Sequence, residues 1–353
     1  MIFNAASLDL PLTISTDLCV IGSGAGGSMV AKVAAEAGMA VTVLETGAFV
    51  PPPAMTQREE EMLPQLLWAG GGQTSTNRGV KIHQGKGVGG STLHNINLCK
   101  RLPEPLRAEW SKERGLKHLP PSRWTYLYDQ VESLLEVSTV PESEWSRHNL
   151  ILQKGCDKLG WRGGGLAHNR TGCIGSGFCL LGCTFDAKNN AAKMVLPPAI
   201  RAGAQILTHC QAVRLRHAGQ RVLGVEAAVL DPFTRKPIGE VYIESPKVCL
   251  SASATGTPAI LLRSKVPDPG NETGNTLRIH PALVAAGEFD EPVRGYAGIP
   301  QTFDCTQFLN FDSPAEQLGN RTWIVTAFAH PAGTASMMPG FGAKHREMMA
   351  RYS

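Results

Sequence analysis

The feature that most constrains the fold is a glycine-rich turn between two short apolar segments near the N-terminus. Residues 18–21 and 41–44 are apolar runs of strand length, and residues 31–37 between them favour a helix. Strand, turn, helix and strand in this order form the unit that opens dinucleotide-binding folds. The sequence therefore predicts an α/β protein with a Rossmann-like domain at its N-terminus.

The turn has the glycine spacing that a pyrophosphate requires. Gly22 allows the tight turn, Gly24 lets the backbone approach the pyrophosphate, and Gly27 lets the helix pack closely on its strand. Glu45 ends the second strand. An acidic side chain at that place accepts hydrogen bonds from an adenosine ribose and repels a 2′-phosphate. These residues predict a dinucleotide site without distinguishing FAD from NAD.

Composition and charge exclude several classes of protein. Of the 353 residues, 42% are hydrophobic and 18% charged, and no apolar run is long enough to span a bilayer. A net charge of +4, without a basic block or a basic-aromatic stripe, argues against a nucleic-acid partner. The N-terminus lacks the pattern of a secretory signal, and Cys19 and Cys249, two of nine cysteines, lie in apolar runs typical of buried reduced thiols. We therefore expect a cytoplasmic protein of two domains or of one elaborated domain.

A second glycine-rich segment runs from Gly85 to Pro103 and reads GKGVGGSTLHNINLCKRLP. Such a density of glycine is typical of a loop. The backbone at its glycines is bare enough to lie against a flat ring or a phosphate, and nearby hydroxyl and amide groups can donate hydrogen bonds. The residues that these two roles single out are Gly87, Gly89, Gly90, Ser91, Asn95 and Asn97. Taken alone, the segment fits a flexible surface loop equally well.

The stretch GKGVGGSTLHN closely resembles the flavin-contacting signature of the glucose-methanol-choline (GMC) oxidoreductases, and it follows the first glycine turn at the distance expected for them. The resemblance implies that the Gly-Gly-Ser-Thr segment lies along FAD and that Asn95 lies near the isoalloxazine ring. It therefore implies FAD as the cofactor and argues against an NAD-linked dehydrogenase.

Residues 204–215, 222–231 and 240–253 are three β-like segments separated by polar or Gly/Pro turns, which predicts a meander. The resemblance implies that this antiparallel meander is inserted into the parallel sheet and that the backbone of Ala212 contacts adenine. The following stretch, SASATGTPAILLRS, resembles the second GMC signature, with Pro258 suited to a first helical turn. It departs from that signature at Ser253, where the family usually has glycine.

Cys173, Cys179 and Cys183 have C-x5-C-x3-C spacing within a glycine-rich segment. Three such thiolates can converge on one inorganic centre, and His168 could complete a zinc site as a fourth ligand. The spacing resembles a GMC branch that includes flavin dehydrogenases with an iron–sulfur cluster and long-chain alcohol oxidases with similar cysteines. The alternatives are thus a cluster that relays electrons to a partner protein or quinone, and reduced thiols that pack a loop.

The resemblance implies an enzyme that oxidises a small-molecule alcohol by passing hydride to FAD. In the family, a histidine near the flavin accepts the hydroxyl proton. That histidine and its partner lie near the C-terminus of a longer chain, so the catalytic residues are not identified here, and the sequence is interpreted as truncated. His330 and His280 are interpreted as structural. The alternative is a non-catalytic nucleotide-binding fragment.

The predicted organisation is an FAD-binding domain at residues 1–275, with an inserted cysteine loop at about 168–190. Residues 276–353 are predicted to start an incomplete α+β substrate-binding domain.

Overall fold

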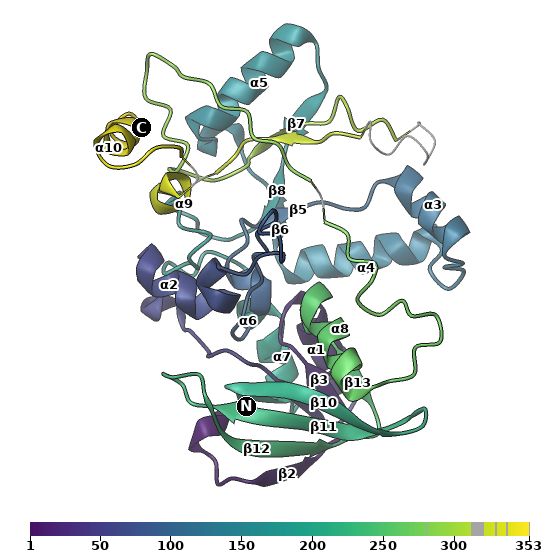
Figure 1. The fold of residues 1–353 in the computed structure, drawn as a ribbon. Helices are drawn as coiled ribbons and strands as arrows, with labels where there is room; N and C mark the ends of the chain where they lie inside the picture. The colour runs from purple at the N-terminus through teal and green to yellow at the C-terminus, as the bar shows by residue number, and fades with distance from the viewer. Residues whose placement is uncertain (280, 312–320, 329, 337, 353) are drawn as a thin grey trace. The chain divides into compact units, whose positions relative to one another are not determined.

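The structure is a computed structural model that describes residues 1–279, 281–311, 321–328, 330–336 and 338–352. The chain forms two compact units (Figure 1). The first unit comprises residues 1–95, 180–186 and 190–281. The second comprises residues 96–179, 187–189 and 282–353, as far as these are described.

A parallel five-stranded sheet forms the centre of the first unit. All its neighbouring strands run parallel, in the order β1 (Ile2–Asn4), β9 (Gln205–Thr208), β4 (Val41–Leu44), β3 (Leu18–Ile21) and β13 (Val248–Leu250). Every residue of β3 and β4 is buried, as expected where a parallel sheet is covered on both faces. Helices α1 (Ala25–Glu36) and α7 (Leu196–Arg201) pack against each other beside this sheet. The predicted Rossmann-like arrangement is confirmed.

The predicted meander forms a second sheet in this unit (Figure 1). Strands β10 (Cys210–Ala218), β11 (Arg221–Leu230) and β12 (Pro237–Glu244) are antiparallel, and β2 (Leu12–Ser15) runs parallel to β12 at the edge. The outer two predicted segments each divide between the sheets. His209, with φ at +54°, separates β9 in the parallel sheet from β10 in the meander. The apolar pattern gave no clear signal of this bend at His209, because L-residues rarely adopt such a conformation.

Helix α8 (Ser253–Ser264) follows β13 and packs on β10. The first unit also contains α2 (Glu59–Leu66) and α6 (Ala191–Met194). Its short 3-10 turns are η1 (Ala5–Ser7), η2 (Pro52–Ala54), η3 (Trp68–Gly71) and η4 (Gly90–Leu93).

The second unit combines helices with two small antiparallel sheets. One sheet has the order β15 (Ile324–Val325), β14 (Phe303–Cys305) and β7 (Gly163–Gly165), and the other β5 (Leu98–Cys99), β8 (Ala167–Asn169) and β6 (Val137–Thr139). Buried Cys156, Phe303 and Cys305 form a core where α5 (Arg147–Leu159) packs on β14. The helical elements are α3 (Glu104–Glu113), α4 (Pro121–Leu134), η5 (Glu142–Glu144), α5 (Arg147–Leu159), α9 (Pro331–Ala335) and α10 (Ala343–Ala350).

The chain passes between the two units more than once. One crossing, between residues 281 and 282, lies near the boundary predicted after residue 275, and residues 96–179 also belong to the second unit. Within that unit, β7 pairs with β14 although about 140 residues lie between them, so contacts distant in sequence determine the division. No helix in the described part of the chain is both long and apolar enough to cross a bilayer.

Candidate functional site

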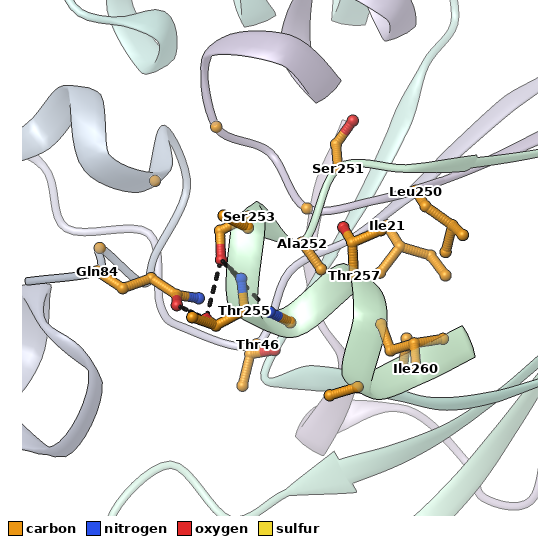
Figure 2. A pocket seen from close by; sticks show the side chains of 18 of the residues that line it. Ile21, Thr46, Gln84, Leu250, Ser251, Ala252, Ser253, Thr255, Thr257 and Ile260 are labelled. Atoms are coloured by element: carbon orange, nitrogen blue, oxygen red, sulfur yellow. Dashed lines mark hydrogen bonds between the residues drawn. The ribbon is translucent and has the colours of Figure 1, made fainter. Parts of the chain in front are cut away.

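A cavity of about 770 Å³ opens within the first unit at the carboxyl ends of β3 and β4 (Figure 2). In open α/β sheets, ligands bind in the crevice at this edge. The cavity has the size of a cofactor site. Several residues predicted to bind the cofactor line it, namely Gly22, Gly24, Glu45, Gly90, Ser91 and Ala212. The fold thus gathers segments that are far apart in sequence around one cavity.

The turn after β3 is packed so closely that its glycines are sterically required. A Cβ on Gly27 would lie 1.9 Å from the carbonyl oxygen of Gly22. Gly22 itself has φ at +98°, and a Cβ there would lie 2.4 Å from the oxygen of Ser251. Gly24, in contrast, would bring a Cβ no closer than 3.8 Å to the backbone of Gly90. The absence of a side chain at Gly22 and Gly27 therefore allows α1 and the end of β13 to pack closely on the turn, while Gly24 leaves room for a ligand.

The second glycine-rich segment touches the first through its backbone. A Cβ on Gly90 would lie 2.7 Å from the Cα of Gly24, and one on Gly47 would lie 2.3 Å from the backbone nitrogen of Gly87. Gly87 and Gly89 have φ at +108° and +107°, a conformation that favours glycine. The second glycine-rich segment is therefore ordered at these positions and forms one wall of the cavity. Gly87 and Gly89 support the wall from outside the cavity lining, and exposed Asn95 also lies outside the lining.

Glu45 lines the cavity, but its carboxylate is surrounded by donors from the chain itself. Oε2 accepts from the backbone N–H of Ser23 at 3.2 Å and from its hydroxyl at 2.6 Å. Oε1 accepts from the backbone N–H groups of Gly47 at 3.0 Å and Gly87 at 2.9 Å. The side chain is 6% exposed. The glycine motif specifies no residue type between Gly22 and Gly24, so the sequence did not identify Ser23 as a hydrogen-bond partner of Glu45.

The other end of the cavity lies between β10 and α8. Gln211 and Ala212 of β10 line it, as do Ile260 and Arg263 of α8. Ile260 packs in the same buried cluster as Ala212. Apolar Ala212 and Ile260 and polar Gln211 and Arg263 thus face the cavity together at this end. Gln211 and Arg263 were not predicted, since the sequence indicated a cofactor contact only at the neighbouring Ala212 and, although Arg263 lies within the second signature stretch, assigned it no contact.

Ser253 stands at the start of α8 with φ at +72°, where the family usually has glycine. Its hydroxyl oxygen accepts long hydrogen bonds from the N–H groups of Thr255 at 3.4 Å and Gly256 at 3.5 Å (Figure 2). The Thr255 hydroxyl in turn donates to Oε1 of Gln84, from the loop before the second glycine segment. Ser253 thus caps the helix from a strained backbone conformation.

We expect Ser253→Gly to raise the free energy of unfolding by about 0.5–1 kcal/mol, because the relief of left-handed strain exceeds the loss of two long hydrogen bonds. Ser253→Ala keeps the strain and loses the bonds, so it should not stabilise the protein. Chemical denaturation of the three proteins measures the difference. Equal stability of the glycine and alanine variants would contradict the strain at this position.

The structure does not gather Cys173, Cys179 and Cys183 into a metal site. Among the residues that it describes, no three His, Cys, Asp or Glu side chains are arranged to hold a metal ion. None of the three is joined in a disulfide. His168 is not a fourth ligand in this structure, because it is fully buried and its Nε2 bonds to the carbonyl oxygen of Gln301 at 3.0 Å. Burial lowers the pKa of His168 to about 4, so the ring is neutral near pH 7.

The remaining candidate histidine, His330, is buried in the second unit and precedes α9. Its ring centroid lies 5.5 Å from that of Phe178 and 5.9 Å from that of Phe328. These contacts give His330 an aromatic packing environment. His280 lies outside the described residues.

Comparisons with known proteins agree with this geometry. Residues 30–282 match the family model described as GMC oxidoreductase. The chain is 32% identical over 342 residues to an uncharacterized GMC-type oxidoreductase of Mycobacterium tuberculosis (strain ATCC 25618 / H37Rv), covering 96% of this chain and 52% of that protein. It is 29% identical over 286 residues to a long-chain-alcohol oxidase of Arabidopsis thaliana, covering 79% of this chain and 38% of the oxidase.

A solved structure supports the fold. Pyridoxine 4-oxidase from Mesorbium loti superposes with a TM-score of 0.51 at 19% identity, covering 71% of this chain and 52% of that one. The chain spans about half the length of the first curated relatives it matches.

Proposed function

Because the chain belongs to the GMC oxidoreductase family, we propose that its first unit binds FAD for an enzyme that oxidises the CH–OH group of an alcohol. The observation that carries the proposal is the cavity at the carboxyl edge of the parallel sheet, walled by two glycine segments in backbone contact. FAD, when bound, supplies a two-electron acceptor for hydride. The chain's own residues would bind and position the cofactor.

The cavity fits an extended dinucleotide. The open face at Gly24 and the N-terminus of α1 suit a pyrophosphate, since backbone N–H groups and the helix dipole favour negative charge there. The Ala212 wall suits adenine. Gly90 and Ser91 suit the part of the cofactor that leads to the flavin, with Gly87 and Gly89 behind them and Asn95 assigned to the isoalloxazine ring by family resemblance.

We assign the FAD-binding role to the first unit and the substrate-binding role to the second, in place of a division at residue 275. The alcohol class is a proposal from two relatives: one is named a long-chain-alcohol oxidase and the other a pyridoxine 4-oxidase. Pyridoxine and long-chain alcohols share a CH–OH group. A primary alcohol is therefore the substrate class that we propose for the whole enzyme.

The cofactor can be tested with the purified protein freed of bound nucleotide. We expect FAD to bind with a defined stoichiometry of one and with a shift of its visible absorption, and NAD⁺ not to compete with it. Isothermal titration with each nucleotide measures this. Binding of NAD⁺ in preference to FAD would contradict the proposal and favour an NAD-linked dehydrogenase.

An iron–sulfur cluster on Cys173, Cys179 and Cys183 stays a proposal from the sequence, since the described residues show no gathered ligands. If the cluster exists, anaerobically reconstituted protein should contain iron and acid-labile sulfide, and Cys179→Ser should remove both. Electrons would then pass singly to a partner protein or quinone. Elemental analysis without iron would leave the thiols as packing groups and favour an oxidase.

None of the nine cysteines, all of which lie in the described part of the chain, is joined in a disulfide. Reduced thiols are usual in proteins of the cytosol. This supports the cytoplasmic location that we propose.

A further inference from the structure

Three basic side chains from separate segments of the first unit lie close together, and we call them the basic cluster. Lys86 belongs to the second glycine segment, His209 separates β9 from β10, and Arg235 lies in the turn between β11 and β12. Nη1 of Arg235 lies 3.3 Å from Nδ1 of His209. The backbone N–H of His209 bonds to the carbonyl oxygen of Gly47 at 3.2 Å, and a Cβ on Gly47 would lie 2.9 Å from the carbonyl carbon of Lys86.

Carboxylates of the chain do not neutralise the basic cluster. Neither Lys86 nor Arg235 forms an ion pair within the described part of the chain. Asp231 is the acidic side chain whose charge acts on His209, but its Oδ1 already accepts from two backbone N–H groups of its own turn. Burial lowers the pKa of His209, and the charges of Arg235 and Lys86 lower it further. The like charges of this cluster therefore repel one another in a partly buried place.

The backbone that carries the basic cluster is strained. His209 has φ at +54° and Arg235 has φ at +61°. Residues other than glycine adopt this left-handed conformation rarely, and such residues concentrate at ligand sites. His209 is only 6% exposed, and its Nε2 has no hydrogen-bond partner among the described residues. Strain, burial and repulsion all oppose this arrangement, whereas a bound anion would offset the repulsion.

We propose that Lys86, His209 and Arg235 form a binding site for a phosphate group, apart from the cofactor cavity. None of the three lines that cavity. The planar guanidinium of Arg235 matches the oxygens of phosphate, and the ammonium of Lys86 adds a compact positive charge. Two fixed positive charges with an imidazole beside them suit the double charge of phosphate better than the single charge of a carboxylate. The site does not depend on the proposed FAD role of the cavity.

Isothermal titration of the purified full chain with inorganic phosphate tests the site. We expect Lys86→Gln and Arg235→Gln each to weaken binding roughly tenfold or more, because each loses a charge-assisted hydrogen bond. Lys247→Gln is the matched control and should leave the affinity unchanged. Exposed Lys247 precedes β13 at the amino edge of the parallel sheet, whereas His209 follows β9 at its carboxyl edge.

Absence of binding to the wild type would overturn the proposal. Equal binding by all four proteins would also overturn it, because the phosphate would then lie elsewhere, as at the turn proposed for the pyrophosphate. Glycerol phosphate in the same titration distinguishes the source of the group. Tighter binding than that of inorganic phosphate would assign the site to a small phosphate monoester, and weaker binding to free phosphate. The proposal requires that whichever binds more tightly depends on Arg235.

A second measurement uses the wild type and does not depend on the folding of a variant. Sulfate keeps its double negative charge while a histidine titrates, so it is the probe. Nuclear magnetic resonance of the labelled histidine rings follows the protonation of His209, and His209→Gln assigns its signal. Excess sulfate should raise the midpoint by roughly one pH unit or more over sodium chloride of the same ionic strength, because a bound anion favours the imidazolium. An unchanged midpoint would overturn the proposal.

Discussion

Replacing Gly24 with valine is expected to abolish FAD retention while the protein stays folded. Gly24 has φ at −66° and ψ at −167°, which any L-residue can adopt. Its Cβ would meet only the Cα of Gly90, at an ordinary contact distance of 3.8 Å. The branched side chain would instead fill the cavity where backbone must approach the pyrophosphate. A hundredfold loss of affinity, or about 2.7 kcal/mol, is the smallest effect that we expect.

The measurement is the ratio of flavin to protein absorbance after purification with excess FAD, together with the thermal midpoint of the apo-protein. Gly155→Val is the control, because a Cβ at Gly155 in α5 of the second unit meets nothing within 4 Å. A variant at Gly24 that is as yellow as the wild type would show that this turn does not hold the cofactor.

Replacing Gly27 with alanine should destabilise the protein by about 3 kcal/mol or more, near the upper end of overpacking effects. The added Cβ would lie 1.9 Å from the Gly22 oxygen and 3.1 Å from the Ser251 side chain. The nearer atom is backbone, so α1 must move away from β3, which draws its own Ala31 and Ala35 out of the buried cluster that they form with residues of the sheet. Denaturant unfolding of the apo-protein measures the loss.

Gly26→Ala is the matched control in the next residue of the same helix. There a Cβ would meet only the Ser251 hydroxyl, at 3.8 Å, and alanine favours a helix by up to about 1 kcal/mol over glycine. We expect that variant to be as stable as the wild type or more stable. Equal effects at positions 26 and 27 would mean that close packing of α1 on the turn is not what requires glycine.

The glycine motif made the first unit predictable because its physical demands are local. The strands before and after the turn, and the close packing at Gly27, follow from a few adjacent residues. The meander was also predictable, since its strands are neighbours in sequence. The edge strands β1 and β2 were not, because their partners lie about 200 residues away and their own apolar runs are short.

The hydrogen-bond donors around Glu45 could not be predicted because they include Ser23 and Gly87, which only the folded chain brings to one carboxylate. The motif indicated an acidic residue beside the cofactor but not the donors around it. The cysteine spacing leaves the metal site undecided for a related reason. Close spacing along a glycine-rich loop permits convergence of thiolates, yet it does not require it, and the described residues hold no such group.

The most direct test of the account is a crystal structure of the protein grown with saturating FAD. We predict the pyrophosphate within hydrogen-bond distance of the backbone of residues 22–27, the adenine beside Ala212, and the Glu45 carboxylate still bound to Ser23 and Gly87. FAD bound at another surface, with the cavity between β10, α8 and the two glycine segments unfilled, would contradict the central claim.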